Sequence, residues 1–76
     1  MTAPAPVKRS VTIAGHRTSL SLEPVFWAAL KRAAAEEGMS INALIAHIDS
    51  GRPGNLSSAV RVWLFERLHA RTERRR

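Results

Sequence analysis

The sequence predicts a mainly α-helical protein with one β-strand per chain, in which two chains pair their strands into an antiparallel ribbon. A stretch of alternating polar and apolar residues at 10–23 precedes three segments of helical periodicity. The chain has 76 residues and no cysteine, so it forms at most one domain, without a disulfide framework or a thiolate zinc site. A single strand has two unpaired edges, and pairing with a second copy of the chain satisfies one of them.

Composition and charge narrow the class of protein. Apolar residues make up 45% of the chain, which favours a folded protein over a disordered one. No apolar run approaches the roughly 20 residues that span a bilayer, and the first ten residues lack the apolar core of a signal peptide. We therefore expect a cytoplasmic protein. The net charge of +6, with basic residues near both ends, favours a polyanionic partner, with nucleic acid ahead of an anionic membrane.

The chain divides into three predicted parts. Residues 1–9, where Pro4 and Pro6 lie among small residues, are predicted to form a flexible arm. Residues 10–71 are predicted to form the folded domain, and residues 72–76 a basic tail.

The alternating stretch consists of two strand-like pieces, 10–15 and 17–22. Its apolar residues stand at odd positions in the first piece and at even positions in the second, so one flat strand cannot present all of them on one face. A bend, a bulge or the start of a separate arm is expected at Gly15. The first piece therefore forms either a second strand or an arm that wraps away.

The ends of the first two helices are marked by local signals. Pro24 suits the first turn of a helix, and Gly38 suits the position just after its end. Ser40 is a good N-cap for the second helix, and the run GRPGN at 51–55 breaks that helix.

The third helix is predicted to begin at Asn55 or Ser57 and to run to about Arg71. Its apolar residues cover more than half of its circumference, which indicates packing on more than one side. We assign Trp63 on this helix to a dimer core. An alternative is that the helix binds a partner protein, as in an antitoxin-like protein or an adaptor, and we expect no membrane partner.

No residues in the sequence are arranged for catalysis. Glu36 and Glu37 are neighbours on a helix and point apart, and His47 and Asp49 do not face each other either. There is no glycine-rich phosphate loop and no nucleophile elbow. The three histidines lie in three different elements, without the paired spacing of metal ligands. The sequence therefore indicates that the protein is not an enzyme and has no metal or cofactor.

The strand and the second helix together suit DNA. A two-stranded antiparallel ribbon fits the major groove, where arginine can donate two hydrogen bonds to guanine and serine can contact several bases. Arg17, Ser19 and Ser21 would face outward from this ribbon. The start of the second helix, at Ser40 and Asn42, presents free amides and the positive end of a helix dipole, which suit a phosphate. Each feature alone also fits a solvated strand or a simple cap, but their combination with the basic charge favours DNA.

Several of these segments resemble the ribbon-helix-helix family of bacterial DNA-binding proteins, typified by the methionine and Arc repressors. They are RTSLSLEP at 17–24, EEGMS at 36–40 and INALIAHI at 41–48. The match covers about residues 16–50, and with NLSSAVRVW at 55–63 the whole chain looks like a small single-domain subfamily.

The resemblance implies a role for each matching residue. It implies that Arg17, Ser19 and Ser21 contact bases and that Ser40 and Asn42 contact phosphates. It further implies a dimer core of Leu20, Leu22, Leu30, Leu44, Ile45 and Ile48. Unlike many members, this chain ends its second helix early and adds a third, and serines discriminate bases less sharply than longer polar residues do.

The sequence as a whole predicts a homodimeric, sequence-specific DNA-binding protein, a transcriptional repressor or other regulator. Its partners would be double-stranded DNA and a second copy of the chain. Lys8 and Arg9 in the arm are predicted to add contacts to the DNA backbone.

Overall fold

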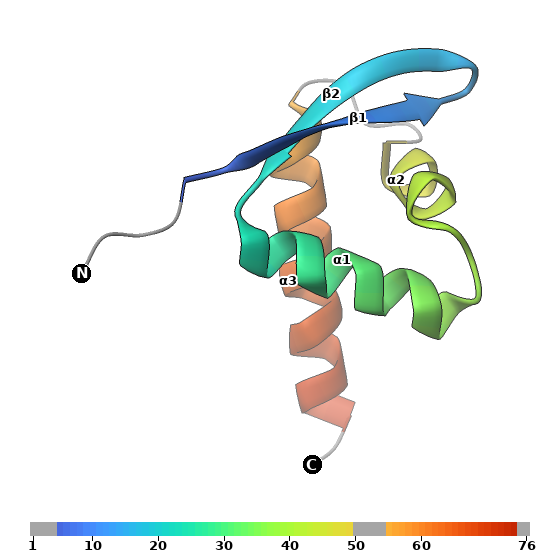
Figure 1. The fold of residues 1–76 in the computed structure, drawn as a ribbon. Coiled ribbons are helices and arrows are strands. Elements are labelled where there is room, and N and C mark those ends of the chain that lie inside the picture. The colour runs from blue at the N-terminus through green and yellow to red at the C-terminus, as the bar shows by residue number, and fades with distance from the viewer. Residues whose placement is uncertain (1–4, 50–54, 75–76) are drawn as a thin grey trace.

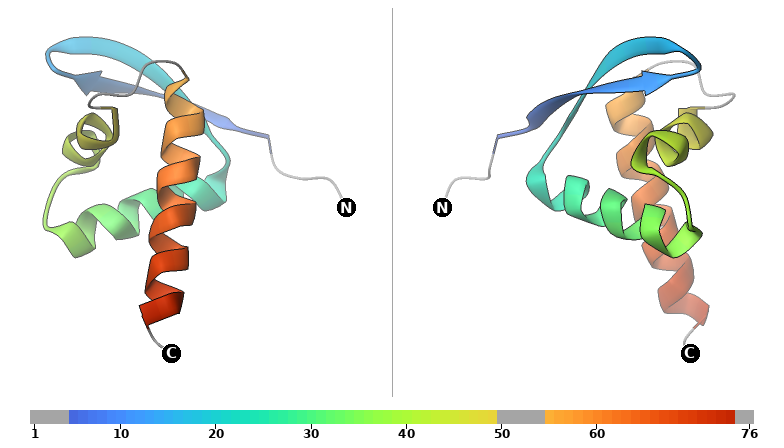
Figure 2. Two further views of the ribbon diagram at one scale, coloured as in Figure 1. Left: turned by 180° about the vertical axis from the view of Figure 1, so that it is seen from behind. Right: turned by 45° about the vertical axis from the view of Figure 1, so that its right-hand side comes forward.

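The computed structural model describes residues 5–49 and 55–74. Within these ranges a hairpin of two antiparallel strands comes first and three helices follow it (Figure 1). Their bounds are, in chain order, β1 Val7–Ile13, β2 His16–Leu22, α1 Pro24–Glu37, α2 Ile41–Asp49 and α3 Leu56–Arg74. The hairpin lies across one end of the molecule, over α2 and the first turns of α3, and the rest of α3 extends away from it (Figures 1 and 2).

The prediction of one strand per chain is wrong, because the chain pairs two of its own strands. β1 and β2 run antiparallel, with Ile13 opposite His16 at the turn. Ala14 and Gly15 form this turn with φ values of 52° and 80°, and positive values at both residues are what a type I′ hairpin turn requires. A two-residue turn pairs odd positions with even ones. The switch of apolar positions across Gly15 therefore reflects a hairpin. Of the two alternatives for residues 10–15, the second strand is confirmed and the arm that wraps away is wrong.

The first strand also starts earlier than predicted. Residues 7–9, assigned above to the flexible arm, are the first residues of β1. Trp27 of α1 holds this end of the strand, since its indole Nε1–H donates a hydrogen bond of 2.9 Å to the carbonyl oxygen of Val7. The rest of the predicted arm lies largely outside the described residues.

The hairpin turn carries a stability prediction. Ala14 has a φ of 52°, a left-handed conformation that disfavours alanine and that asparagine tolerates. Ala14→Asn creates the Asn-Gly pair typical of type I′ turns, and it should raise the free energy of unfolding by about 0.5–1 kcal/mol. Urea denaturation at one fixed protein concentration measures the change. The β-branched variant Ala14→Val should be less stable than the wild type, and equal stability of all three proteins would contradict the turn geometry.

The local signals for both ends of the first helix and for the start of the second are confirmed. α1 begins at Pro24 and is followed by Gly38, whose φ is 69° and whose N–H donates to the carbonyl oxygen of Ala35 at 3.1 Å. The Ser40 Oγ accepts a hydrogen bond of 3.0 Å from the N–H of Ala43, so Ser40 caps α2.

The third helix is longer than predicted. The Asn55 Oδ1 accepts a hydrogen bond of 3.2 Å from the N–H of Ser58, which makes Asn55 the N-cap, the first of the two predicted starts. The helix continues to Arg74 rather than ending near Arg71, so the predicted tail at 72–76 begins inside it. Most of the predicted break before this helix lies outside the described residues.

The core lies between the inner face of the hairpin and the three helices. Each of the six aliphatic residues expected in a dimer core is at most 3% exposed in the single chain: Leu20, Leu22, Leu30, Leu44, Ile45 and Ile48. Trp63 is half-buried and packs against the edge of this core. The remaining buried residues are Val11, Trp27, Ala33, Ala34, Val60 and Leu64. One chain therefore covers this core by itself, and a contact between two copies through these residues stays a prediction.

Ion pairs link the far end of α1 to α3. Arg67 donates to Glu37 at 2.7 Å and to Glu36 at 3.0 Å, and Arg71 also donates to Glu36 at 3.0 Å. The hydrogen bond from Arg67 is the main cause that lowers the pKa of Glu36, and the same contact raises the pKa of Arg67.

These ion pairs predict a pH-dependent contribution to stability. The pKa of Glu36 is lower in the folded chain than its ordinary value of 4.5. The ion pair therefore stabilises the fold above that value and loses its effect as the pH falls through the folded pKa. Arg67→Met, which keeps an apolar stem, should lower the free energy of unfolding at pH 7. The difference from the wild type should shrink as the pH falls below 4.5. The Arg67 guanidinium also lies 5.5 Å from the centre of the Trp63 ring. A difference in stability that stays constant in denaturation curves across this pH range would assign the effect to this contact instead of to the ion pairs.

Candidate nucleic-acid interface

The outward face of the hairpin carries polar side chains from both strands. Residues that are paired across an antiparallel ladder share one face of the sheet. The three outward positions of each strand are directly paired with those of the other strand, and five of the six side chains are exposed. We call these residues the ribbon face: Lys8, Ser10 and Thr12 on β1, and Arg17, Ser19 and Ser21 on β2.

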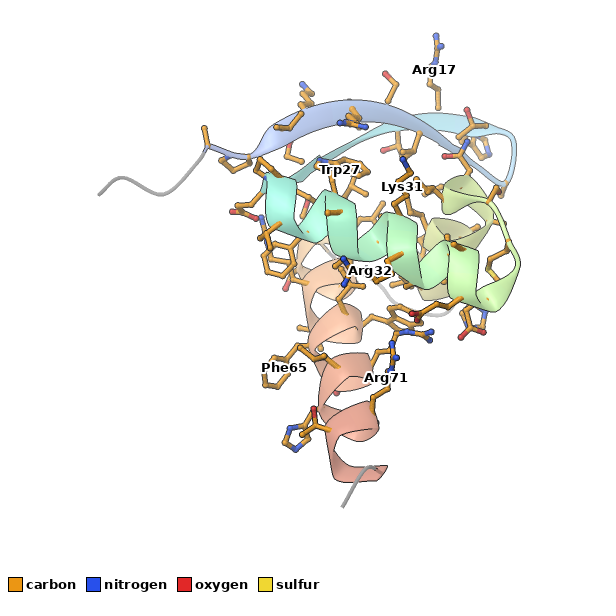
Figure 3. All side chains as sticks on the ribbon, turned by 60° about the horizontal axis from the view of Figure 1, so that its bottom comes forward. Arg17, Trp27, Lys31, Arg32, Phe65 and Arg71 are labelled. Carbon is orange, nitrogen blue, oxygen red and sulfur yellow. The ribbon has the colours of Figure 1, made fainter. Side chains whose placement is uncertain are left out.

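The ribbon face offers cations and hydroxyl groups without any carboxylate. Residues 7–22 contain no aspartate and no glutamate. In the described part of the chain, the six side chains of this face make no hydrogen bond and no ion pair. Arg17 projects away from the hairpin and from the helices beneath it (Figure 3). All six side chains are thus available to a ligand that accepts hydrogen bonds.

Three glutamates at the start and the far end of α1 are paired with arginines of α3. Glu23 at the start of α1 accepts a bond of 3.0 Å from Arg61 of α3, in addition to the pairs of Glu36 and Glu37 described above. A backbone hydrogen bond and the bond from Arg61 lower the pKa of Glu23. These glutamates compensate charge on the helices and leave the positive charge of the hairpin uncompensated.

The two predicted arm cations lie on opposite faces of the hairpin. Lys8 is paired with Ser21 and belongs to the ribbon face. Arg9 is paired with Leu20 and turns toward the helices, where its guanidinium lies 5.0 Å from the centre of the Trp27 ring. Lys8 therefore lies on the same face as the predicted base-contacting residues, whereas the side chain of Arg9 packs on the inner side.

The start of α2 presents the two predicted phosphate-contacting residues. Ser40 and Asn42 are both exposed. The Ser40 hydroxyl accepts a hydrogen bond from the N–H of Ala43, which leaves other amides of the first turn for an external acceptor. α2 lies under the turn end of the hairpin in each view and contacts β1 (Figures 1 and 2).

Sequence reasoning missed two residues of the ribbon face. Ser10 and Thr12 lie opposite Ser19 and Arg17, and they join the outward face only because β1 pairs with β2. The odd-to-even switch across Gly15 was the signal that could have found them, since it is the pattern of a hairpin with a two-residue turn.

A second surface lies between α1 and α3, away from the hairpin. It is a groove of about 290 Å³ with an apolar floor. Val25, Phe65 and Leu68 line it and remain 65–69% exposed. Charged residues at its rim include Arg32 and Arg71, which flank the groove with Phe65 in Figure 3.

The described residues hold no group of three or more histidine, aspartate or glutamate side chains that could bind a metal ion. Across residues 5–49 and 55–74, none of the helices combines the length and apolar character needed to cross a membrane.

Comparison with known proteins places the chain in a family. A model of the ribbon-helix-helix domain matches residues 6–68. A solved structure of an uncharacterized protein from Bordetella pertussis Tohama I is similar, with a TM-score of 0.80 and 29% sequence identity. The similarity covers 97% of this chain and 64% of that one, and no curated protein matches significantly. Two paired strands followed by helices, with a match over most of the length, show that the chain belongs to the ribbon-helix-helix domain family.

Proposed function

We propose that this chain is a homodimeric, sequence-specific DNA-binding protein, a transcriptional repressor or other regulator that acts in the bacterial cytoplasm. The ribbon face carries the proposal: six polar side chains without a carboxylate, on the side of the hairpin opposite the core. Ribbon-helix-helix domains are generally DNA-binding regulators, and a two-stranded ribbon is narrow enough to enter the major groove.

In this proposal β2 supplies the dimer contact. Within the described residues β2 pairs with β1 along one edge, so its other edge presents N–H and C=O groups without a strand partner. Antiparallel pairing of β2 with β2 of a second copy satisfies these groups around a two-fold axis. The result is a four-stranded sheet with the two β2 strands at its centre and a β1 strand on either side.

The two kinds of DNA contact come from different elements. Arg17, Ser19 and Ser21 on the central strands contact base edges, where a bidentate arginine–guanine pair is worth about 1–3 kcal/mol of discrimination. Ser40 and Asn42 at the start of α2 hold flanking phosphates through amides and the helix dipole. Base contacts supply the specificity, and phosphate contacts fix the position of the protein on the duplex.

Fluorescence anisotropy on duplexes selected from the source genome tests this function, with random duplexes as the comparison. We expect tighter binding to the selected duplexes. If a dimer neutralises about six to ten phosphates, the logarithm of the binding constant should fall against the logarithm of salt concentration with a slope of about −5 to −9. A slope near zero, or equally weak binding to both sets, would contradict DNA recognition.

A second candidate function, compatible with the first, is capture of a partner protein in the α1–α3 groove. Val25, Phe65 and Leu68 stay exposed there, and exposed apolar patches of this kind mark interaction surfaces. Arginines outnumber glutamates around the groove, and the whole chain carries a charge of +6. A second copy would bring the same positive charge, so the occupant that fits is an amphipathic helix with acidic residues beside its apolar stripe.

An acidic amphipathic helical peptide with a leucine stripe tests this candidate, and the same peptide with lysines in place of glutamates is its control. We expect the acidic peptide to bind the wild type and to lose binding to Phe65→Glu. Two results would contradict the assignment: equal binding of both peptides, or a fall in the molecular mass of the Phe65→Glu protein in light scattering. The latter would show that a second copy fills the groove.

A further inference from the structure

We propose that β1 forms a dedicated backbone-contacting strand: its outward residues Lys8, Ser10 and Thr12 bind the sugar–phosphate backbone beside the groove that β2 enters. This inference rests on the proposed DNA-binding function and extends it. In this inference β1 adds affinity for DNA of any sequence, and β2 alone discriminates between bases.

The register places the two rows of side chains on one surface. Lys8 is directly opposite Ser21, and Ser10 is directly opposite Ser19, so these pairs point to the same side of the sheet. Their side chains stand about 5 Å apart across the ladder. A duplex that reaches the β2 row from this side therefore also meets the β1 row.

The width of the sheet separates the roles of the two rows. Neighbouring strands lie about 4.8 Å apart, so the outer strands of the four-stranded sheet lie about 7 Å on either side of its centre. The major groove is about 12 Å wide and reaches about 6 Å from its midline to each wall. The central β2 strands fit between these walls, whereas each β1 strand lies over a wall, where the phosphates are.

The chemistry of the β1 row suits that position. An ammonium group and two hydroxyl groups are donors of the kind that contact phosphate oxygens in protein–DNA complexes. All three side chains are exposed, and they have no partner among the described residues. None of the three offers the planar, bidentate donor pattern with which arginine recognises guanine, which Arg17 on β2 does.

Two matched double variants test the proposal. Ser10→Ala with Thr12→Val removes two hydroxyl groups from β1, and Ser19→Ala with Ser21→Ala removes two from β2. Valine keeps the β-branched shape that suits a strand, and equal thermal unfolding temperatures would verify that both variants fold. Anisotropy titrations on selected and random duplexes then give an affinity and a specificity ratio for each protein.

We expect the β1 variant to bind selected and random duplexes about tenfold more weakly, with an unchanged ratio between them. The β2 variant should mainly lower that ratio. Lys8→Gln should reduce the magnitude of the salt slope by about two for a dimer, because each lysine neutralises one phosphate.

Two results would overturn the assignment of β1. A lower specificity ratio in the β1 variant would place β1 inside the groove. If the Ser10→Ala, Thr12→Val variant binds DNA as tightly as the wild type, and Lys8→Gln leaves the salt slope unchanged, β1 lies outside the interface with DNA. Failure of the proposed function is recognised separately, because the wild type itself would then show no preference for selected duplexes and no salt dependence.

Discussion

Replacing Arg17, Ser19 and Ser21 together with alanine is expected to remove most of the discrimination between selected and random DNA. Each outward arginine can supply about 1–3 kcal/mol by bidentate pairing with guanine, and a dimer presents two copies. The specificity ratio should therefore fall by at least about 30-fold, the equivalent of 2 kcal/mol. Because the three side chains are on the ribbon face and make no hydrogen bond or ion pair within the described residues, the fold and the dimer should persist.

Arg32→Ala is the matched control for this variant. Arg32 is also an exposed arginine, but it lies at the rim of the α1–α3 groove. Its removal takes away the same charge as Arg17→Ala and should leave the specificity ratio unchanged. A similar loss of discrimination in both proteins would show that net charge, and not the ribbon face, governs DNA recognition.

Trp27→Ala is expected to have the largest effect on stability. Trp27 is 7% exposed, its Nε1–H donates to the carbonyl oxygen of Val7, and the Arg9 guanidinium lies over its ring. Truncating a buried tryptophan to alanine costs about 3–5 kcal/mol, which equals the whole stability that a small core usually provides. We expect the alanine variant to be largely unfolded at 25 °C by circular dichroism.

The milder variant Trp27→Phe isolates the contact to β1. Phenylalanine keeps most of the buried ring but cannot donate to Val7, and the loss of one such hydrogen bond costs about 0.5–1.5 kcal/mol. Amide hydrogen exchange should speed up at the start of β1 more than in α2. Uniformly faster exchange throughout the chain would mean that Trp27 supports only the general core and does not specifically hold β1.

The helix ends were predictable because their signals are local. Gly38 and Ser40 act on backbone groups within three residues of themselves, so single positions in the sequence suffice to locate the helix ends. The apolar stripe of α2 likewise predicted the burial of Leu44, Ile45 and Ile48.

The hairpin was misjudged because its turn has an unusual first residue. Type I′ turns favour asparagine, aspartate or glycine there, and Ala14 gives no such signal. Without a turn signal at Ala14, pairing of residues 17–22 with the same strand of a second chain accounted equally well for the free N–H and C=O groups of that strand. Once β1 pairs within the chain, Ser10 and Thr12 join the ribbon face and Arg9 turns inward, which no inspection of β2 alone could show.

The attachment of α3 was invisible for a different reason. Arg67 and Arg71 reach glutamates 30–35 residues earlier in the chain, and periodicity within one helix carries no information on such partners. Its apolar circumference predicted packing on more than one side, but the chain itself covers only one face, which carries the buried Val60 and Leu64 and the half-buried Trp63. Packing on a second side stays a prediction. The exposure of Phe65 and Leu68 followed only from the three-dimensional arrangement.

Titration of the ¹⁵N-labelled protein with a selected duplex, followed by amide chemical shifts, tests the central claim most directly. We expect the largest changes along β1 and β2 and at the start of α2 around Ser40, with small changes in the second half of α3. The same titration with a random duplex should reproduce the changes in β1 and at Ser40 more fully than those at Arg17 and Ser19. Changes confined to α3, with an undisturbed hairpin, would contradict the claim that the ribbon face binds DNA.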